Sequence, residues 1–127
     1  MTNLDMFSKE EATKILLQLG VPANLQGFTY LQNCVVSVVK NPKKIRRVTK
    51  NLYPEIGEEY SVNGSVVERS MRHATEIGYM KTGFKSLHSI FGLESQTLSY
   101  KPTNCELIAI ISEVLRFKAH KAGLLDN

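Results

Sequence analysis

Two arginines, Arg69 and Arg72, lie three residues apart near the middle of the 127-residue chain. Apolar residues around them, including Val67 and Met71, recur at the spacing of a helix. The pattern predicts a helix over residues 65–80 that carries both arginines on the face opposite its apolar stripe. A guanidinium group presents a planar fork of donors that matches the paired acceptors on the edge of guanine. The two arginines are therefore the first candidates for contacts with bases.

The residues beside the arginines allow related chemistry. Glu68 can accept a hydrogen bond from the amino group of cytosine, or it can form a capping box with Ser65 at the start of the helix. Ser65 is first a helix cap and second a phosphate contact. His73 can donate to a phosphate when protonated, or it can lie neutral at the flank of the helix. The remaining candidates for phosphate or flanking contacts are Val66, Lys81 and Lys101.

A short predicted helix, residues 54–60, and a turn, residues 61–64, precede the helix that carries the arginines. A short helix, a turn and a longer helix form the outline of a helix-turn-helix motif. In that motif the second helix enters the major groove of DNA, and its early residues meet base edges. The alternative is ordinary helix packing with a solvated charged face, in which the arginines pair with Glu68 or Glu76.

The rest of the chain also predicts helices. Ser8 and Glu11 have the form of a capping box that opens a first helix, and Thr103 and Glu106 have the same form before the last one. The fold class is all-α, in one domain of residues 1–127 with a core over about residues 8–118. The predicted helices cover residues 8–19, 25–39, 42–52, 54–60, 65–80 and 85–91, followed by a loop at 93–102 and a last helix from Thr103.

Composition narrows the class of protein. The net charge is +4 and the sequence pI is about 9.1, a basic balance that suits a nucleic-acid partner. No apolar run approaches the roughly 18 residues that cross a bilayer, and no secretory signal opens the chain, so we expect a cytoplasmic protein without a membrane partner. His73 and Glu76, one helical turn apart, are too common a pair to indicate acid–base catalysis. We therefore expect that the protein is not an enzyme and that it has no cofactor and no metal site.

The two cysteines lie far apart and have no neighbours at the spacing of metal ligands. Cys34 falls in an apolar run and is predicted to lie in the core. Cys105 falls in the first turn of the last helix, where a helix N-terminus can lower the pKa of a thiol.

Several blocks of the sequence resemble, in the same order, the C-terminal DNA-binding effector domain of the sporulation master regulator of endospore-forming Firmicutes. This regulator is a response regulator. The similarity covers about residues 12–118, nearly the whole chain. The matching blocks are GVPANLQGFTYL (20–31), TKNLYPEIGEEY (49–60), SVVERSMRHATE (65–76), FG (91–92) and KPTNCELIAIISEVLR (101–116).

The resemblance implies a compact bundle of about six helices around a helix-turn-helix. It implies binding to short promoter boxes of double-stranded DNA, with a homodimer on tandem sites and RNA polymerase as further candidate partners. In the family a receiver domain precedes the effector. The chain is then either an excised fragment or a free-standing relative, and the opening Met1 favours the second.

The sequence departs from the family at the start of the recognition helix. The family has Ser-Arg-Val-Glu-Arg, whereas this chain has Val66 in place of the first arginine. Valine cannot donate a hydrogen bond, although it can contact a thymine methyl group. Glu68, Arg69, Arg72 and His73 match the family.

Two functional hypotheses from different classes follow, and a third keeps DNA binding but shifts its specificity through Val66. The leading one is a sequence-specific DNA-binding transcription regulator that reads promoter boxes with the helix at 65–80 in the major groove. The alternative is a protein-interaction module that has lost specific DNA reading and modulates a full-length regulator by pairing with it.

Overall fold

The computed structural model describes residues 1–91 and 101–126, and every regular element in that part of the chain is helical. The all-α prediction is therefore confirmed for these residues, whereas most of the loop predicted at 93–102 lies outside them. The elements, in chain order, are α1 (Asn3–Gln18), α2 (Gln26–Lys40), the 3₁₀ helix η1 (Pro42–Arg47), the π turn η2 (Val48–Leu52), α3 (Tyr53–Glu59), α4 (Gly64–Thr82), α5 (Ser86–Phe91) and α6 (Asn104–Lys121).

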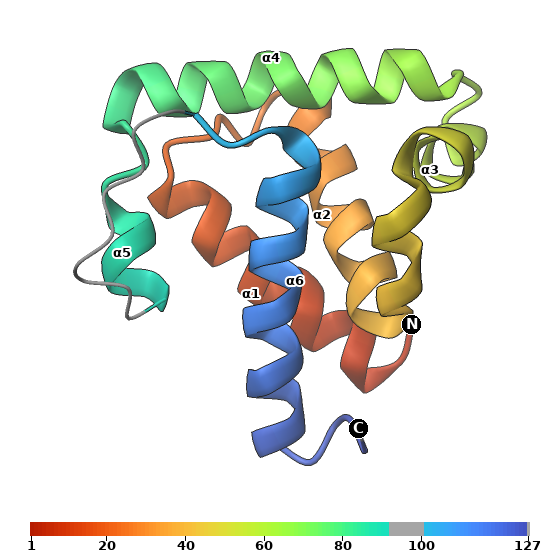
Figure 1. Cartoon of the computed structure of the whole chain (residues 1–127), viewed down its shortest axis with the longest axis vertical. Helices are drawn as coiled ribbons and strands as arrows, with labels where there is room; N and C mark the ends of the chain where they lie inside the picture. The colour runs from red at the N-terminus through yellow and green to blue at the C-terminus, as the bar shows by residue number, and fades with distance from the viewer. Residues whose placement is uncertain (92–100, 127) are drawn as a thin grey trace.

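The core lies between α1, α2 and α6, and α4 extends across one end of these helices (Figure 1). Each helix contributes side chains without solvent exposure, among them Leu16, Val35, Met71 and Ile111. Fully burying a side chain of this kind contributes about 1.5–3 kcal/mol. Because α4 buries only its inner face, its outer face stays free over most of its length.

Helix α1 begins at Asn3, five residues before the start predicted at Ser8. Its N-cap is Thr2, which accepts from the backbone amide of Asp5, and the Asp5 carboxylate accepts in return from the amide of Thr2. Ser8 does not cap a helix, because it lies within α1 and is 1% exposed. The capping chemistry is the same as predicted, but a second Thr-x-x-Asp pattern lies closer to the chain start. The additional turn also packs Leu4 against the core.

The predicted helix at residues 42–52 is divided in two. Its first half is η1, and the backbone at Arg47 then leaves helical angles, with φ −137° and ψ 54°, before η2 begins. Ile45 on η1 and Val48 at the start of η2 both pack against the core, and Leu52 at the end of η2 is fully buried.

Gly27 allows α2 to lie directly against α4. A Cβ atom added to Gly27 would overlap the carbonyl of Ser70 and would lie 2.9 Å from the Cβ of Ala74. The added atom would meet backbone on the facing helix, so a side-chain rotation cannot relieve the overlap. The position of α4 therefore depends on the missing side chain at residue 27.

We predict that Gly27→Ala lowers the free energy of unfolding by about 3 kcal/mol, at the upper end for overpacking, because the added atom would meet backbone and separate the two helices. Gly83→Ala is the matched control. The nearest heavy atom to a Cβ at Gly83 is 4.0 Å away, so the cost there is only the left-handed backbone at φ +62°, about 1 kcal/mol. Urea denaturation measures both. An equal loss in the two variants would contradict the close-packing argument.

Candidate nucleic-acid interface

A tight turn joins α3 to α4 and fixes the angle between them. The amides of Tyr60 and Val62 both donate to the carbonyl of Gly57, at 2.9 and 3.0 Å. Ser61, within the turn predicted at residues 61–64, takes the left-handed conformation, with φ 58°. Gly57 is needed here because a Cβ would overlap the carbonyl of Val62. Tyr60 then ties the turn to α2, since its hydroxyl accepts from Asn33 at 2.9 Å.

The N-cap of α4 is Asn63, not Ser65. The Asn63 side chain accepts from the amide of Val66 at 3.2 Å, and the helix begins at Gly64. The Ser65 hydroxyl is exposed and donates to the same Asn63 oxygen at 2.6 Å. The predicted Ser65–Glu68 capping box is therefore wrong, because asparagine two residues earlier is an equally strong cap. Glu68 is left free to make other contacts.

The inner face of α4 is held along its whole length. Near its middle, Met71 is fully buried and its sulfur lies 3.8 Å from that of Cys34 on α2. Further along, Gly78 lies against the backbone of the α1–α2 connection, where a Cβ would come within 3.0 Å of the Leu19 carbonyl. At the end of the helix, the Thr82 hydroxyl donates to that same carbonyl at 2.9 Å. These contacts turn the opposite face outward.

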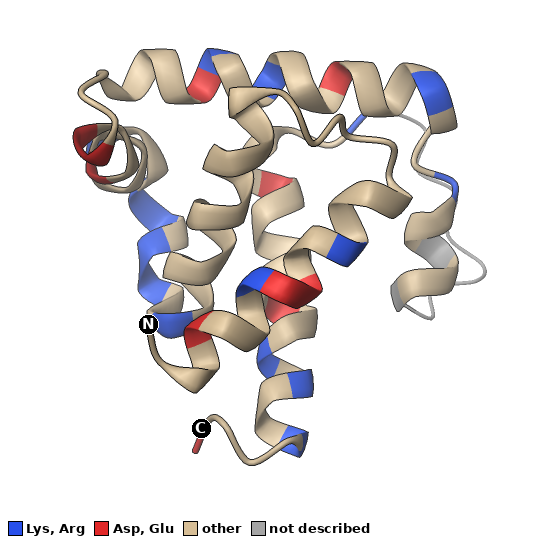
Figure 2. Cartoon of the chain, turned by 180° about the vertical axis from the view of Figure 1, so that it is seen from behind, with Lys and Arg blue, Asp and Glu red and all other residues tan. Residues whose placement is uncertain are grey.

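The outer face of α4 carries charges of both signs (Figure 2). Arg69, His73, Glu76 and Lys81 are all exposed. Arg69 has no hydrogen-bond or ion-pair partner among the residues that the structure describes. The sequence prediction that Arg69 and Arg72 lie opposite the apolar stripe agrees with this arrangement, because Val67, Met71 and Ala74 are fully buried.

Arg72 is paired with Glu68. Its Nη1 lies 2.8 and 2.9 Å from the two carboxylate oxygens, and the side chains are 50% and 34% exposed. An exposed pair of this kind, four residues apart on a helix, stabilises by only about 0.3–0.5 kcal/mol. The guanidinium can therefore leave Glu68 at little cost when a stronger acceptor arrives. Of the two roles that the sequence suggested for Glu68, the helix cap is wrong, and in the free protein its carboxylate pairs with Arg72.

A surface pocket of about 410 Å³ borders the first turn of α4. It is formed where η2 and the start of α6 meet that turn, so hydroxyl groups from three segments line it. Hydroxyls and helix N-termini are common contacts for backbone phosphates. The lining residues are Val48, Thr49, Tyr53, Gly64, Ser65, Glu68, Thr103, Asn104 and Cys105.

Two further predicted residues lie at the border of this face. Val66 is half-buried in the first turn of α4. Lys101 is half-buried before α6, and burial lowers the pKa of its ammonium group. The nearby Arg72 guanidinium lowers that pKa further, whereas the carboxylates of Glu76 and Glu68 act in the opposite direction. Lys101 therefore interacts with the charged side chains in the middle of α4. Its position in the sequence, about 30 residues after Arg72, does not indicate this proximity.

The cysteine thiols take no part in this face. Cys34 lies in the core, as predicted, and burial raises the pKa of its thiol to about 12. Burial also raises the pKa of the Cys105 thiol, so the lowered pKa suggested by its place at a helix N-terminus is wrong. The neighbouring Glu106 carboxylate raises that pKa further. In the described part of the chain no three His, Cys, Asp or Glu side chains gather as metal ligands would, and no helix is long and apolar enough to cross a membrane.

The family described as sporulation initiation factor Spo0A C terminal matches residues 12–115. The chain belongs to this family. The Spo0A C-terminal family is a family of DNA-binding regulatory domains and not of enzymes, and its members act in transcription regulation and sporulation. The match spans every element from the second half of α1 to most of α6, so it includes α3, the turn and the whole of α4.

We predict that Asn63→Ala lowers the free energy of unfolding by about 1 kcal/mol, because it removes the side-chain cap of α4. Ser65→Ala should change it by less than about 0.5 kcal/mol, as for an exposed residue without a capping role. Chemical denaturation of both variants measures the difference. A larger loss at Ser65 than at Asn63 would restore the capping box that the sequence suggested.

Proposed function

We propose that this chain is a sequence-specific transcription regulator that inserts α4 into the major groove of promoter DNA. The observation that carries the proposal is the exposed guanidinium of Arg69, which has no partner among the described residues and lies on the outer face of a capped helix. The α3–turn–α4 unit supplies the helix-turn-helix outline, with α4 as the recognition helix. Family membership supports DNA binding of this kind.

The base contacts would come from three residues. Arg69 is free to take a guanine edge directly. Arg72 exchanges its exposed pairing with Glu68 for the same kind of contact, and Glu68 then becomes available to a cytosine amino group. A guanine and a cytosine of one base pair, or of neighbouring pairs, would satisfy both released groups at once. Val66 can add an apolar contact with a thymine methyl group.

The phosphate contacts would flank this centre. Ser65 lines the surface pocket beside the first turn of α4, and Lys101 lies close enough to the middle of the helix to interact with Arg72 and Glu76. His73 and Lys81 are exposed on the same helix. The net charge of α4 is only +1, because its three cationic residues are offset by two carboxylates. The cations are Arg69, Arg72 and Lys81, and the carboxylates are Glu68 and Glu76. Affinity must therefore also draw on cations outside α4. A homodimer on tandem boxes and a contact with RNA polymerase stay predictions from the family.

Selection of bound sites from a random pool of duplexes, at a stated salt concentration, tests the proposal. We expect the chain to select a short motif, and Arg69→Ala to reduce discrimination at one base pair by about 1–3 kcal/mol. Arg46→Ala removes the same charge from an exposed position on η1 and is the matched control. It should weaken binding to all duplexes alike. Uniform weak binding, unchanged by Arg69→Ala, would contradict the proposal.

Val66 supports a second candidate function. Where the family has a base-contacting arginine, this half-buried valine offers no donor to a base. The chain could then act as an interaction module that pairs with a full-length regulator of the same family. We expect such a module to retain that regulator in a pull-down at micromolar concentration and to select no DNA motif. A selected motif without any retained regulator would eliminate this candidate.

A further inference from the structure

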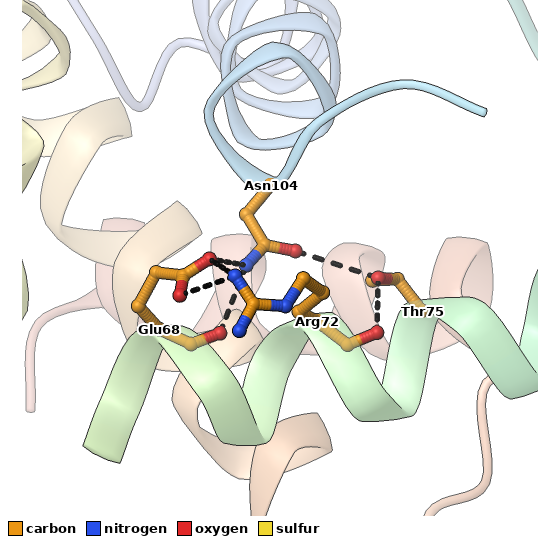
Figure 3. A network of polar contacts seen from close by, with 4 residues as sticks. All are labelled: Glu68, Arg72, Thr75 and Asn104. Atoms are coloured by element: carbon orange, nitrogen blue, oxygen red, sulfur yellow. Dashed lines mark hydrogen bonds and ion pairs between the residues drawn. The ribbon is translucent and has the colours of Figure 1, made fainter. Parts of the chain in front are cut away.

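The side chain of Asn104, at the start of α6, contacts the N-terminal half of α4 (Figure 3). Its amide nitrogen donates to the backbone carbonyl of Glu68 at 3.0 Å and lies 3.4 Å from a Glu68 carboxylate oxygen. Asn104 is only 6% exposed. It is therefore too deeply buried to contact a duplex itself, although it contacts a residue that can.

The groups around Asn104 fix which way its amide points. Thr75 is fully buried, and its hydroxyl lies 3.0 Å from the Arg72 carbonyl and 3.4 Å from the amide oxygen of Asn104. The single hydroxyl hydrogen of Thr75 goes to the nearer Arg72 carbonyl, so Thr75 does not decide which end of the amide faces it. The orientation follows from Glu68, because its carbonyl and its carboxylate are both acceptors and require the NH₂ end of Asn104.

The contacts form one connected series across the two helices. Asn104 faces the Glu68 carboxylate, and the same carboxylate holds Nη1 of Arg72 at 2.8 and 2.9 Å. An amide donor on one side and a guanidinium on the other restrict the rotamer of Glu68. The resting position of Arg72 follows from that of Glu68, since its guanidinium has this carboxylate as its ion-pair partner.

We propose that Asn104 is a positioning residue for base recognition, which acts through Glu68 on the base pair that Glu68 and Arg72 read. The inference rests on the proposed function, because it assigns a determinant of specificity to the same face. It extends the recognition surface to a buried residue of another helix, 36 positions away from Glu68 in the sequence. A purely structural Asn104 would bind only the Glu68 carbonyl, and its loss would then affect stability without affecting the choice of base.

The test compares Asn104→Ala, Glu68→Ala and the double variant on the selected DNA site. The competing duplexes carry one changed base pair each. We expect Asn104→Ala to reduce discrimination at the base pair read by Glu68 and Arg72 about fivefold or more, and to leave discrimination at the Arg69 position unchanged. In the Glu68→Ala background, Asn104→Ala should cause no further loss of discrimination, because the group through which it acts is absent.

Two further variants separate positioning from folding. Asn104→Leu removes the donor with a side chain of similar size and shape and adds no charge beside the Glu68 acceptors, so it should retain the fold and still lose discrimination. Ile111→Val truncates a fully buried side chain of the same helix. It should lower stability without altering the choice of base. An Asn104→Ala variant that weakens all duplexes equally, as Ile111→Val would, overturns the inference.

A measurement without DNA separates this inference from the proposed function. NMR relaxation of the Arg72 side chain should show increased mobility in both Asn104→Ala and Glu68→Ala. Unchanged mobility in Asn104→Ala overturns the positioning role, whatever the DNA results. Increased mobility in a chain that selects no DNA motif would instead support the positioning role of Asn104 and overturn the proposed function, and with it the role in base choice.

Discussion

The direct backbone contact between α2 and α4 at Gly27 is the constraint on which the arrangement of the outer face depends. At this position the facing carbonyl of Ser70 lies where a Cβ would be. Such an approach brings Met71 within reach of Cys34 and lets Ala74 fill the remaining space. Because these contacts fix the rotation of α4 about its own axis, they also fix which residues face outward. The exposure of Arg69 is therefore a consequence of packing on the opposite side of the same helix.

The two faces of α4 are stabilised by different means. The inner face relies on burial and close contact, which depend little on salt. The outer face relies on exposed charges, which contribute little to folding and are screened by salt. As a result, the fold does not require the outer charges to take any one arrangement. Within the described part of the chain, Glu68 is the only one of these charged groups with a hydrogen bond to another helix, through Asn104.

Much of the fold could be predicted from local patterns. The Thr103–Glu106 capping box is present as predicted, with both reciprocal hydrogen bonds. The same pattern failed at Ser8 and Ser65, where Thr2 and Asn63 offer caps closer to the start of each helix. Local patterns do not rank two adjacent caps, since the choice depends on what the additional turn can bury.

The parts that could not be predicted depend on contacts between distant segments. Nothing near Gly27 in the sequence indicates that Ser70 lies against it, and nothing near Asn104 indicates Glu68. Asparagine in the first turn of α6 looks like an ordinary helix-start residue. Only the approach of α6 to α4 gives its amide a further role. The charged face itself was easier to identify, because helical periodicity alone places Arg69 and Arg72 opposite Val67 and Met71.

The carboxylate of Glu68 resembles the ligand that its neighbour would bind. It offers Arg72 two anionic oxygens, as a nucleic acid offers oxygens and ring nitrogens. A duplex that approached Arg72 would displace this substitute, which the protein itself provides, at a cost of only about 0.3–0.5 kcal/mol. A correct base pair can replace that substitute and also engage the displaced carboxylate, whereas an incorrect one leaves the carboxylate facing negative charge. Glu68 would in this way reduce non-specific binding to DNA.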